Sequence, residues 1–160
     1  NIVGEFQKSL YGFKPHAIQR AIDKGYKKII WFAPCVLPTV SIQVLIDSLD
    51  TNHLIVRTGD SDMRKMVNDK ALKWFEINRE DLSGVTHIGG TIYGFNFNDE
   101  EVMDTFKLWK WSEESGMFGT QDEFMAGHWS DESCMVLALQ KIGMKQYWEE
   151  KFNYLNQKEL

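Results

Sequence analysis

A short apolar run places the strongest limit on how this chain can fold. Residues 29–32 read Ile-Ile-Trp-Phe, and they follow a helix stop at Gly25. A continuous run of this length predicts a strand over 26–32 that is buried on both faces. Just before it, Pro15 opens a segment with apolar residues at helical spacing, which predicts a helix over 15–24. Helix and strand therefore alternate from the start of the chain.

The rest of the sequence continues this alternation. We predict helices over 39–49, 61–75, 99–115 and 130–142, strands over 53–57 and 91–97, a loop over 116–127, and a peripheral helical segment over 145–160. Ser61, Asn98 and Ser130 are the expected N-terminal caps. The 160 residues contain no linker or internal repeat, so one domain spanning residues 1–160 is expected. The predicted architecture is a single α/β domain with a mixed sheet flanked by helices.

Charge and composition exclude several partners. The chain carries 18 basic and 23 acidic residues, a net charge of −5, which makes nucleic acid a poor partner. No segment approaches the roughly 20 apolar residues of a membrane span. Two cysteines are too few for a disulfide framework, and a cytoplasmic location is the expectation. Because the chain begins at Asn1 with neither an initiator Met nor a signal-like segment, we expect it to be processed, trimmed or part of a longer protein.

Three segments carry polar or glycine residues at the ends of predicted strands, where ligands bind in open α/β sheets. The first is the loop Ala33-Pro34-Cys35, which has no carboxylate where an acidic metal-binding pair would stand. Cys35 could act as a metal ligand or a nucleophile. A lone cysteine without a nearby base is more often a small buried apolar residue, and we favour that interpretation.

The second segment runs from His87 to Asn96. Its glycine pair, Gly89 and Gly90, allows the backbone to approach a ligand closely, and Asn96 could bind a sugar hydroxyl. The alternative is that the glycines only form a turn and that His87 is a polar residue satisfied within the fold. The sequence leaves both interpretations open.

The third segment, Gly127 to Ser133, has the densest group of chemically active side chains. It contains His128, Trp129, Asp131 and Glu132 at the start of a predicted helix. A carboxylate can take a proton from a hydroxyl, while histidine binds a metal or phosphate and tryptophan stacks on a sugar. The two carboxylates could equally serve only to complement the helix dipole.

In this order, the segments resemble nucleotide-diphospho-sugar transferases of the GT-A type, over residues 11–144 or so. The resemblance is carried by four pieces: Tyr11-Gly12-Phe13-Lys14-Pro15, residues 28–32, residues 89–96 and residues 127–132. It implies a single-domain GT-A-like fold that transfers a sugar from a nucleotide-diphosphate sugar to a glycan or other hydroxyl acceptor. It also implies a divalent cation, Mn²⁺ or Mg²⁺, that neutralises the diphosphate.

The resemblance also assigns roles to particular residues. Asp131 and Glu132 are the catalytic candidates, His128 is the candidate metal ligand, and Lys14, Gly90, Asn96 and Trp129 are the candidate substrate-binding residues. Such enzymes end the first of these strands in an Asp-x-Asp motif, and the matching positions here are Ala33 and Cys35. The N-terminal nucleotide-binding part is also short. The alternative function is therefore a non-catalytic glycan- or protein-binding domain that keeps the same fold.

Overall fold

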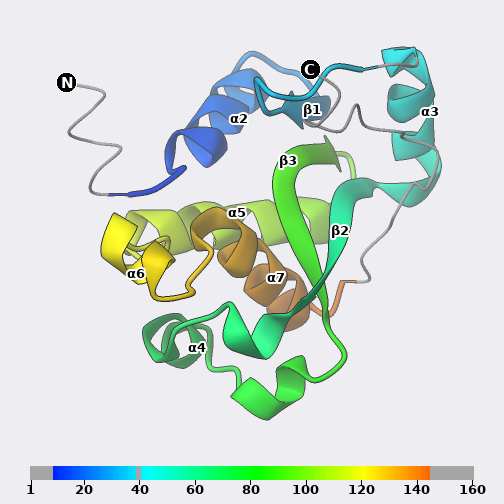
Figure 1. Cartoon of the computed structure of the whole chain (residues 1–160). Helices are drawn as coiled ribbons and strands as arrows, with labels where there is room; N and C mark the ends of the chain where they lie inside the picture. The colour runs from blue at the N-terminus through cyan, green and yellow to red at the C-terminus, as the bar shows by residue number, and fades with distance from the viewer. Residues whose placement is uncertain (1–8, 39–40, 145–160) are drawn as a thin grey trace.

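The computed structural model describes residues 9–38 and 41–144 (Figure 1). This part of the chain holds six α-helices and three β-strands. In chain order they are α2 (Phe13–Asp23), β1 (Lys28–Phe32), α3 (Ile42–Asn52), β2 (Leu54–Asp62), α4 (Asp69–Phe75), β3 (Thr86–Asn96), α5 (Glu100–Glu114), α6 (Gln121–Met125) and α7 (Ser130–Ile142), with 3₁₀ turns at Met63–Lys65 and Arg79–Leu82. A mixed α/β architecture is therefore confirmed.

The three strands form one sheet in the order β1-β3-β2, and both pairings are antiparallel. Tyr93 of β3 lies opposite Trp31 of β1 on one side and Val56 of β2 on the other. β1 and β2 run in the same direction, but β3 lies between them and runs the opposite way. In the described residues the sheet is thus antiparallel, and the prediction of a mixed sheet is wrong for this part of the chain.

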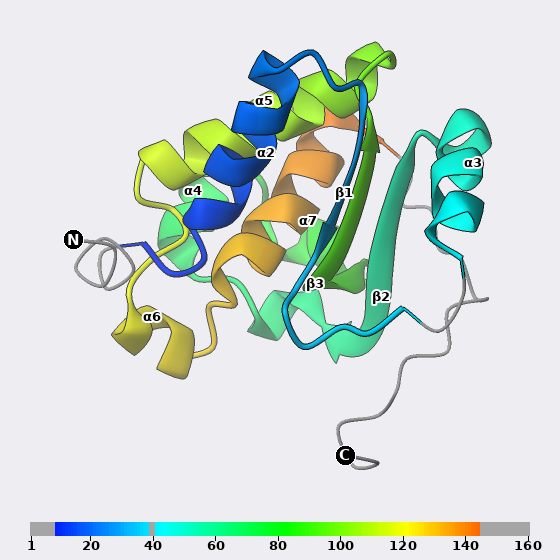
Figure 2. The same cartoon turned by 90° about the horizontal axis from the view of Figure 1, so that it is seen from above.

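Helices cover both faces of this sheet (Figure 2). On one face, Leu45 and Leu49 of α3 pack against Ile55 in a small apolar cluster. On the other face, α2, α5 and α7 enclose the main core, in which the rings of Phe106 and Trp109 are fully buried. Each large apolar side chain buried this way stabilises the fold by about 1.5–3 kcal/mol.

Several helix boundaries follow from capping residues. The Ser41 side chain caps α3, and Asp99 caps α5 by accepting a hydrogen bond from Val102 N at 3.0 Å. The predicted helix over 61–75 is replaced by three elements, because β2 extends to Asp62, whose carboxylate caps the 3₁₀ turn that follows. Asn68 then caps the shorter helix α4.

Two further sequence predictions concern the loop over 116–127 and the helical segment over 145–160. The predicted loop over 116–127 contains the short helix α6, which has a capping box between Thr120 and Glu123. The peripheral helical segment expected over 145–160 lies outside the described residues. Within the described ranges, none of the helices combines the length and the apolar character that crossing a membrane requires.

Candidate functional site

The site is built around Gly90 of β3, the central strand of the sheet. β1 ends at Phe32, and the last main-chain bond on that side joins Ala33 N to Thr91 O at 2.8 Å. Gly90 falls within the register shift between Val56 and Arg57 of β2, and two side chains bond to its main chain. Lys14 Nζ donates to Gly90 O at 2.9 Å, and Gly90 N donates to Glu132 Oε1 at 2.6 Å. The starts of α2 and α7 are thereby held at the same point of the sheet.

Position 90 has no room for a side chain. A Cβ atom there would lie 2.6 Å from Lys14 Nζ, 2.8 Å from Asp131 Oδ2 and 3.1 Å from Glu132 Cγ. Gly90 was predicted to allow a close approach of backbone to a ligand. In the structure it is the charged side chains of the protein itself that approach so closely.

Replacing Gly90 with Ala is expected to lower the free energy of unfolding by about 1–3 kcal/mol, because the added methyl group overpacks this cluster. Gly89→Ala is the matched control, since a Cβ there has Arg57 Cδ as its nearest neighbour at 3.6 Å. The control should stay within about 0.5 kcal/mol of the wild type. Urea unfolding of the three proteins tests this, and equal losses at the two positions would contradict it.

Beneath Gly90 lies a buried ion pair. Lys14 Nζ and Asp131 Oδ2 are 2.7 Å apart, with side-chain exposures of 6% and 1%. The Tyr93 hydroxyl donates to the same carboxylate oxygen at 3.1 Å, and Trp109 Nε1 donates to the main-chain oxygen of Asp131 at 2.9 Å. Asp131 is thus enclosed by α2, β3 and α5, and neither Lys14 nor Asp131 offers a surface to a ligand.

Burial raises the pKa of Asp131 from 3.8 to about 6, against the opposing effect of Lys14, and the nearby charge of Glu132 adds to the rise. The folded protein therefore binds this proton more tightly than the unfolded chain does. The contribution of Asp131 to stability is complete below about pH 4 and is lost as the pH rises through about 6.

This gives a pH prediction that uses Asp131→Asn as the reference protein. Relative to this variant, the wild type should lose up to about 3 kcal/mol of unfolding free energy between pH 4 and pH 7. Denaturant unfolding at closely spaced pH values measures the difference. A difference that is constant with pH, or that grows in favour of the wild type, would rule out the raised pKa.

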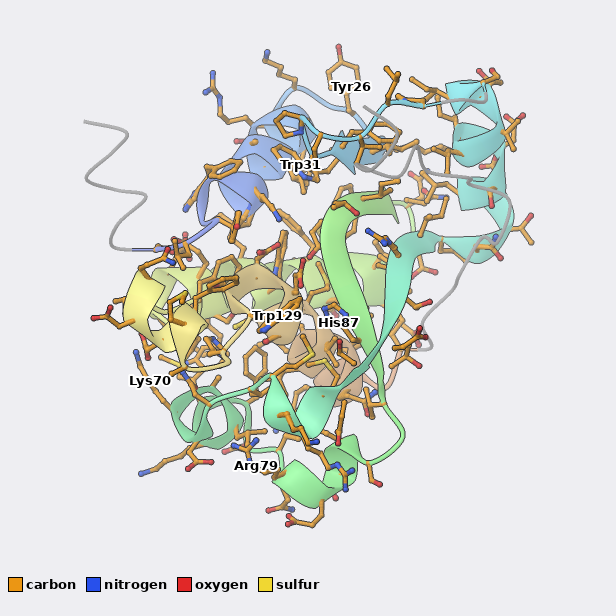
Figure 3. The ribbon with its side chains drawn as sticks, in the orientation of Figure 1. Tyr26, Trp31, Lys70, Arg79, His87 and Trp129 are labelled. Atoms are coloured by element: carbon orange, nitrogen blue, oxygen red, sulfur yellow. The ribbon has the colours of Figure 1, made fainter. Side chains whose placement is uncertain are left out.

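Glu132 differs from Asp131 in being reachable from solvent. Its second oxygen, Oε2, lies 2.9 Å from His87 Nε2, and the Glu132 side chain is 20% exposed. Trp129, 37% exposed, meets the His87 ring edge-to-face with centroids 5.2 Å apart, and Figure 3 shows the two side chains next to each other. Glu132 and Trp129 therefore form the outer part of the cluster.

The backbone is strained on both sides of this cluster. Ser130, the first residue of α7, has φ +45°, and Tyr11, just before α2, has φ +61°. Both are outside the conformations that residues with side chains prefer, and such strain gathers at functional sites. The Tyr11 ring lies 4.6 Å from Lys14 Nζ. Burial and then the negative charges of Asp131 and Glu132 raise the pKa of its hydroxyl.

Two of the predicted site residues, Asn96 and His128, lie elsewhere. Asn96 is at the far end of β3, opposite Lys28, and its amide donates to Leu49 O at 3.0 Å. His128 is 1% exposed; its Nδ1 accepts from Asn68 N at 3.4 Å and its Nε2 donates to Met117 O at 2.7 Å. Burial lowers the pKa of His128, and both ring nitrogens are bonded within the fold. In the parts of the chain that the structure describes, no group of three or more His, Cys, Asp or Glu side chains is placed to hold a metal ion.

The first of the three polar segments also needs a correction. Cys35, expected to be a small buried apolar residue, is exposed. Cys35 lies in a turn that follows Ala33, beyond the end of β1, so its side chain is not buried within the sheet. Ala33 itself is bonded through its main chain to Thr91, next to Gly90.

The sequence interpretation overlooked an acidic triplet at the end of β2. Asp60, Ser61 and Asp62 line a surface hollow of about 480 Å³ together with Gly59, Arg64 and residues 84–86. Arg64 holds the Asp62 carboxylate with bonds of 3.0 and 2.8 Å and lowers its pKa. The triplet has the Asp-x-Asp spacing that the resemblance places at positions 33 and 35, and it becomes visible as a strand end only when β2 is given its full length to Asp62.

Tyr93 escaped the sequence interpretation, because its partner Asp131 is distant in the chain. His87, for which the sequence left open a polar residue satisfied within the fold, is buried and lies 2.9 Å from Glu132. His87 lies opposite Gly59 in the β2–β3 ladder, so it lies between the triplet's strand and Glu132.

Comparison of the chain with protein-family models, with curated proteins and with solved structures gives no match. The functional argument therefore depends on the geometry of the site.

Proposed function

We propose that this chain transfers a sugar from a nucleotide-diphosphate sugar to a hydroxyl acceptor, and that the reaction takes place beside Gly90 of β3 within a GT-A-like fold. One observation carries the proposal. Of the residues that the resemblance assigns to substrate and catalysis, Lys14, Gly90, Trp129, Asp131 and Glu132 form one cluster, although Lys14 and Asp131 are 117 positions apart in sequence.

The two carboxylates take different roles in this proposal. Asp131 is enclosed and bonded to Lys14 and Tyr93, so it holds the site together. Glu132 reaches solvent and keeps two lone pairs after its bonds to Gly90 and His87. Glu132 is therefore the base: it takes the proton of the acceptor hydroxyl, the hydroxyl oxygen bonds to the anomeric carbon, and the bond from that carbon to the diphosphate oxygen breaks.

Trp129 supplies an apolar surface beside this carboxylate. Its ring is partly exposed and is supported by His87 at 5.2 Å and by Phe124 at 6.1 Å between centroids. An indole held in this way offers a flat face on which the apolar side of a sugar ring can pack. Trp129 thus serves as the sugar-binding residue of the proposal.

Asp60 and Asp62 are the residues that would hold the divalent cation. Mg²⁺ and similar ions prefer carboxylate oxygens and commonly use one or two of them together with substrate phosphates, so a site with two protein carboxylates suits them. Both Asp62 oxygens are bonded to Arg64, so a cation would have to replace that guanidinium at Asp62. When bound, the cation would neutralise charge on the leaving diphosphate. Lys14, which is buried in its ion pair, has no phosphate-binding role in this scheme.

A thermal melting experiment tests the cation and donor together. We expect uridine or guanosine diphosphate to raise the melting temperature by several degrees at 100 times its dissociation constant, and only with Mn²⁺ present. The variant D60N/D62N should lose this shift. D104N/D122N removes two other exposed carboxylates and should keep it. An equal shift in both variants would refute the cation site, and a protein that no nucleotide stabilises would favour the non-catalytic binding domain.

A further inference from the structure

We infer that His87 is a positioning residue: it holds the Glu132 carboxylate in the orientation that faces the acceptor hydroxyl. This inference rests on the proposed function. His87 touches no reacting atom in this scheme. Its effect is on the direction in which the remaining lone pairs of Glu132 point.

The Glu132 carboxylate is anchored at both oxygens. Oε1 accepts from Gly90 N at 2.6 Å, and Oε2 lies 2.9 Å from His87 Nε2. An ionised carboxylate only accepts hydrogen bonds, so Nε2 carries the donated proton. Glutamate has three rotatable side-chain bonds, and with the Gly90 bond alone the group could still pivot about Oε1. The bond from His87 removes that freedom.

The His87 ring is itself held in place. Its side chain is 9% exposed, and Trp129 contacts it edge-to-face with an interplanar angle of 85°. On the β2 side, a Cβ atom on Gly59 would lie 2.8 Å from His87 Nδ1, so the absence of a side chain at Gly59 provides the space for the ring. A donor fixed on two sides can impose its orientation on a flexible acceptor.

The position of His87 also relates Glu132 to the acidic triplet. Gly59, its partner across the β2–β3 ladder, directly precedes Asp60. The proposed base and the proposed cation-binding triplet are thus connected through one strand pair and one side-chain bond. A shift of about 1 Å in a reacting group can cost on the order of 10²-fold in rate, so this connection has a kinetic consequence.

The positioning is tested by NMR, without any need for activity. The Gly90 amide proton reports on the short bond to Glu132, because a strong bond to a carboxylate moves it downfield. We compare His87→Gln, which keeps an N–H donor of similar reach, with His87→Leu, which has none. Neither variant has the imidazole ring, so ring-current changes are matched between them.

The Gly90 amide proton is expected to move upfield in His87→Leu and to stay downfield in His87→Gln. The Ile92 amide, two residues along β3, serves as the control for an intact strand. Equal Gly90 shifts in the two variants would overturn the inference. If His87→Leu does not fold, His87→Asn replaces it, because its amide is too short to reach Glu132.

A kinetic arm uses whichever of UDP-glucose, UDP-galactose or GDP-mannose the wild type cleaves. In His87→Leu we expect kcat to fall on the order of 10²-fold with KM nearly unchanged, and His87→Gln should recover most of the loss. A change confined to KM would contradict a positioning role. If the wild type cleaves none of the three, the proposed function fails for these donors, while the Gly90 comparison still decides the role of His87.

Discussion

Replacing Lys14 with Met is expected to lower the free energy of unfolding by about 3–5 kcal/mol at pH 8. The substitution leaves the Asp131 carboxylate, 1% exposed, without its cation at 2.7 Å. Its remaining side-chain partner is the Tyr93 hydroxyl at 3.1 Å, which cannot offset the cost of keeping a charge away from water. Gly90 O loses its donor in the same step. Urea unfolding at pH 8 measures the loss.

The loss from Lys14→Met should depend strongly on pH. Asp131 already has a pKa raised to about 6, and without Lys14 it rises further, so at pH 5 the group is protonated and most of the penalty disappears. The double variant K14M/D131N should recover stability at pH 8 for the same reason. Lys107→Met, in an ion pair with side-chain exposures of 65% and 57%, is the control and should cost little. An equal loss at pH 5 and pH 8 would show that the charge of Asp131 is not the cause.

Glu132→Gln is expected to reduce nucleoside-diphosphate release on the order of 10²–10⁴-fold, because it removes the proposed base while keeping the size of the side chain. The amide oxygen can still accept from Gly90 N, so the local structure around Gly90 should be retained. Release of the diphosphate from a nucleotide sugar, followed in a coupled assay, gives the rate.

Glu101→Gln is the matched control for that experiment, since Glu101 is an exposed glutamate in the first turn of α5. It should release the diphosphate at the wild-type rate. If Glu132→Gln is also as active as the wild type, Glu132 is not the base, and the role of the cluster at Gly90 would be to support the fold.

The local structure could be predicted because it depends on neighbouring residues. Pro15 and the apolar residues at helical spacing define helices that appear within a few residues of their expected ends, although Asp99 and not the expected Asn98 caps α5. The order of strands in the sheet depends on pairing between distant segments. Nothing near residues 91–97 shows that this strand would be inserted between the other two and run against them.

The candidate site could be predicted in part for the same reason. The cluster at residues 129–132 is visible in the sequence, but the burial of Asp131 and the exposure of Glu132 depend on how α7 meets β3. Lys14 and Asp131 carry opposite charges and no local signal connects them. Asp131 and Glu132 are adjacent in the sequence, and their different environments arise only when the chain folds.

The Asp60-Ser61-Asp62 triplet was not predicted for a different reason. Asp60-Ser61-Asp62 is present in the sequence, but the resemblance places the Asp-x-Asp motif after the first strand, at Ala33 and Cys35. The prediction that residues 61–75 form one helix also hid the end of β2, which continues to Asp62. A strand end can only be searched for ligands once the strand has been given its full length.

The most direct test of the central claim is to measure nucleoside-diphosphate release by the wild-type chain from a panel of uridine and guanosine diphosphate sugars, with and without Mn²⁺. We predict release from at least one donor, dependent on Mn²⁺ and nearly absent in Glu132→Gln. No release from any donor, by a chain that melts cooperatively, would contradict glycosyl transfer at this site.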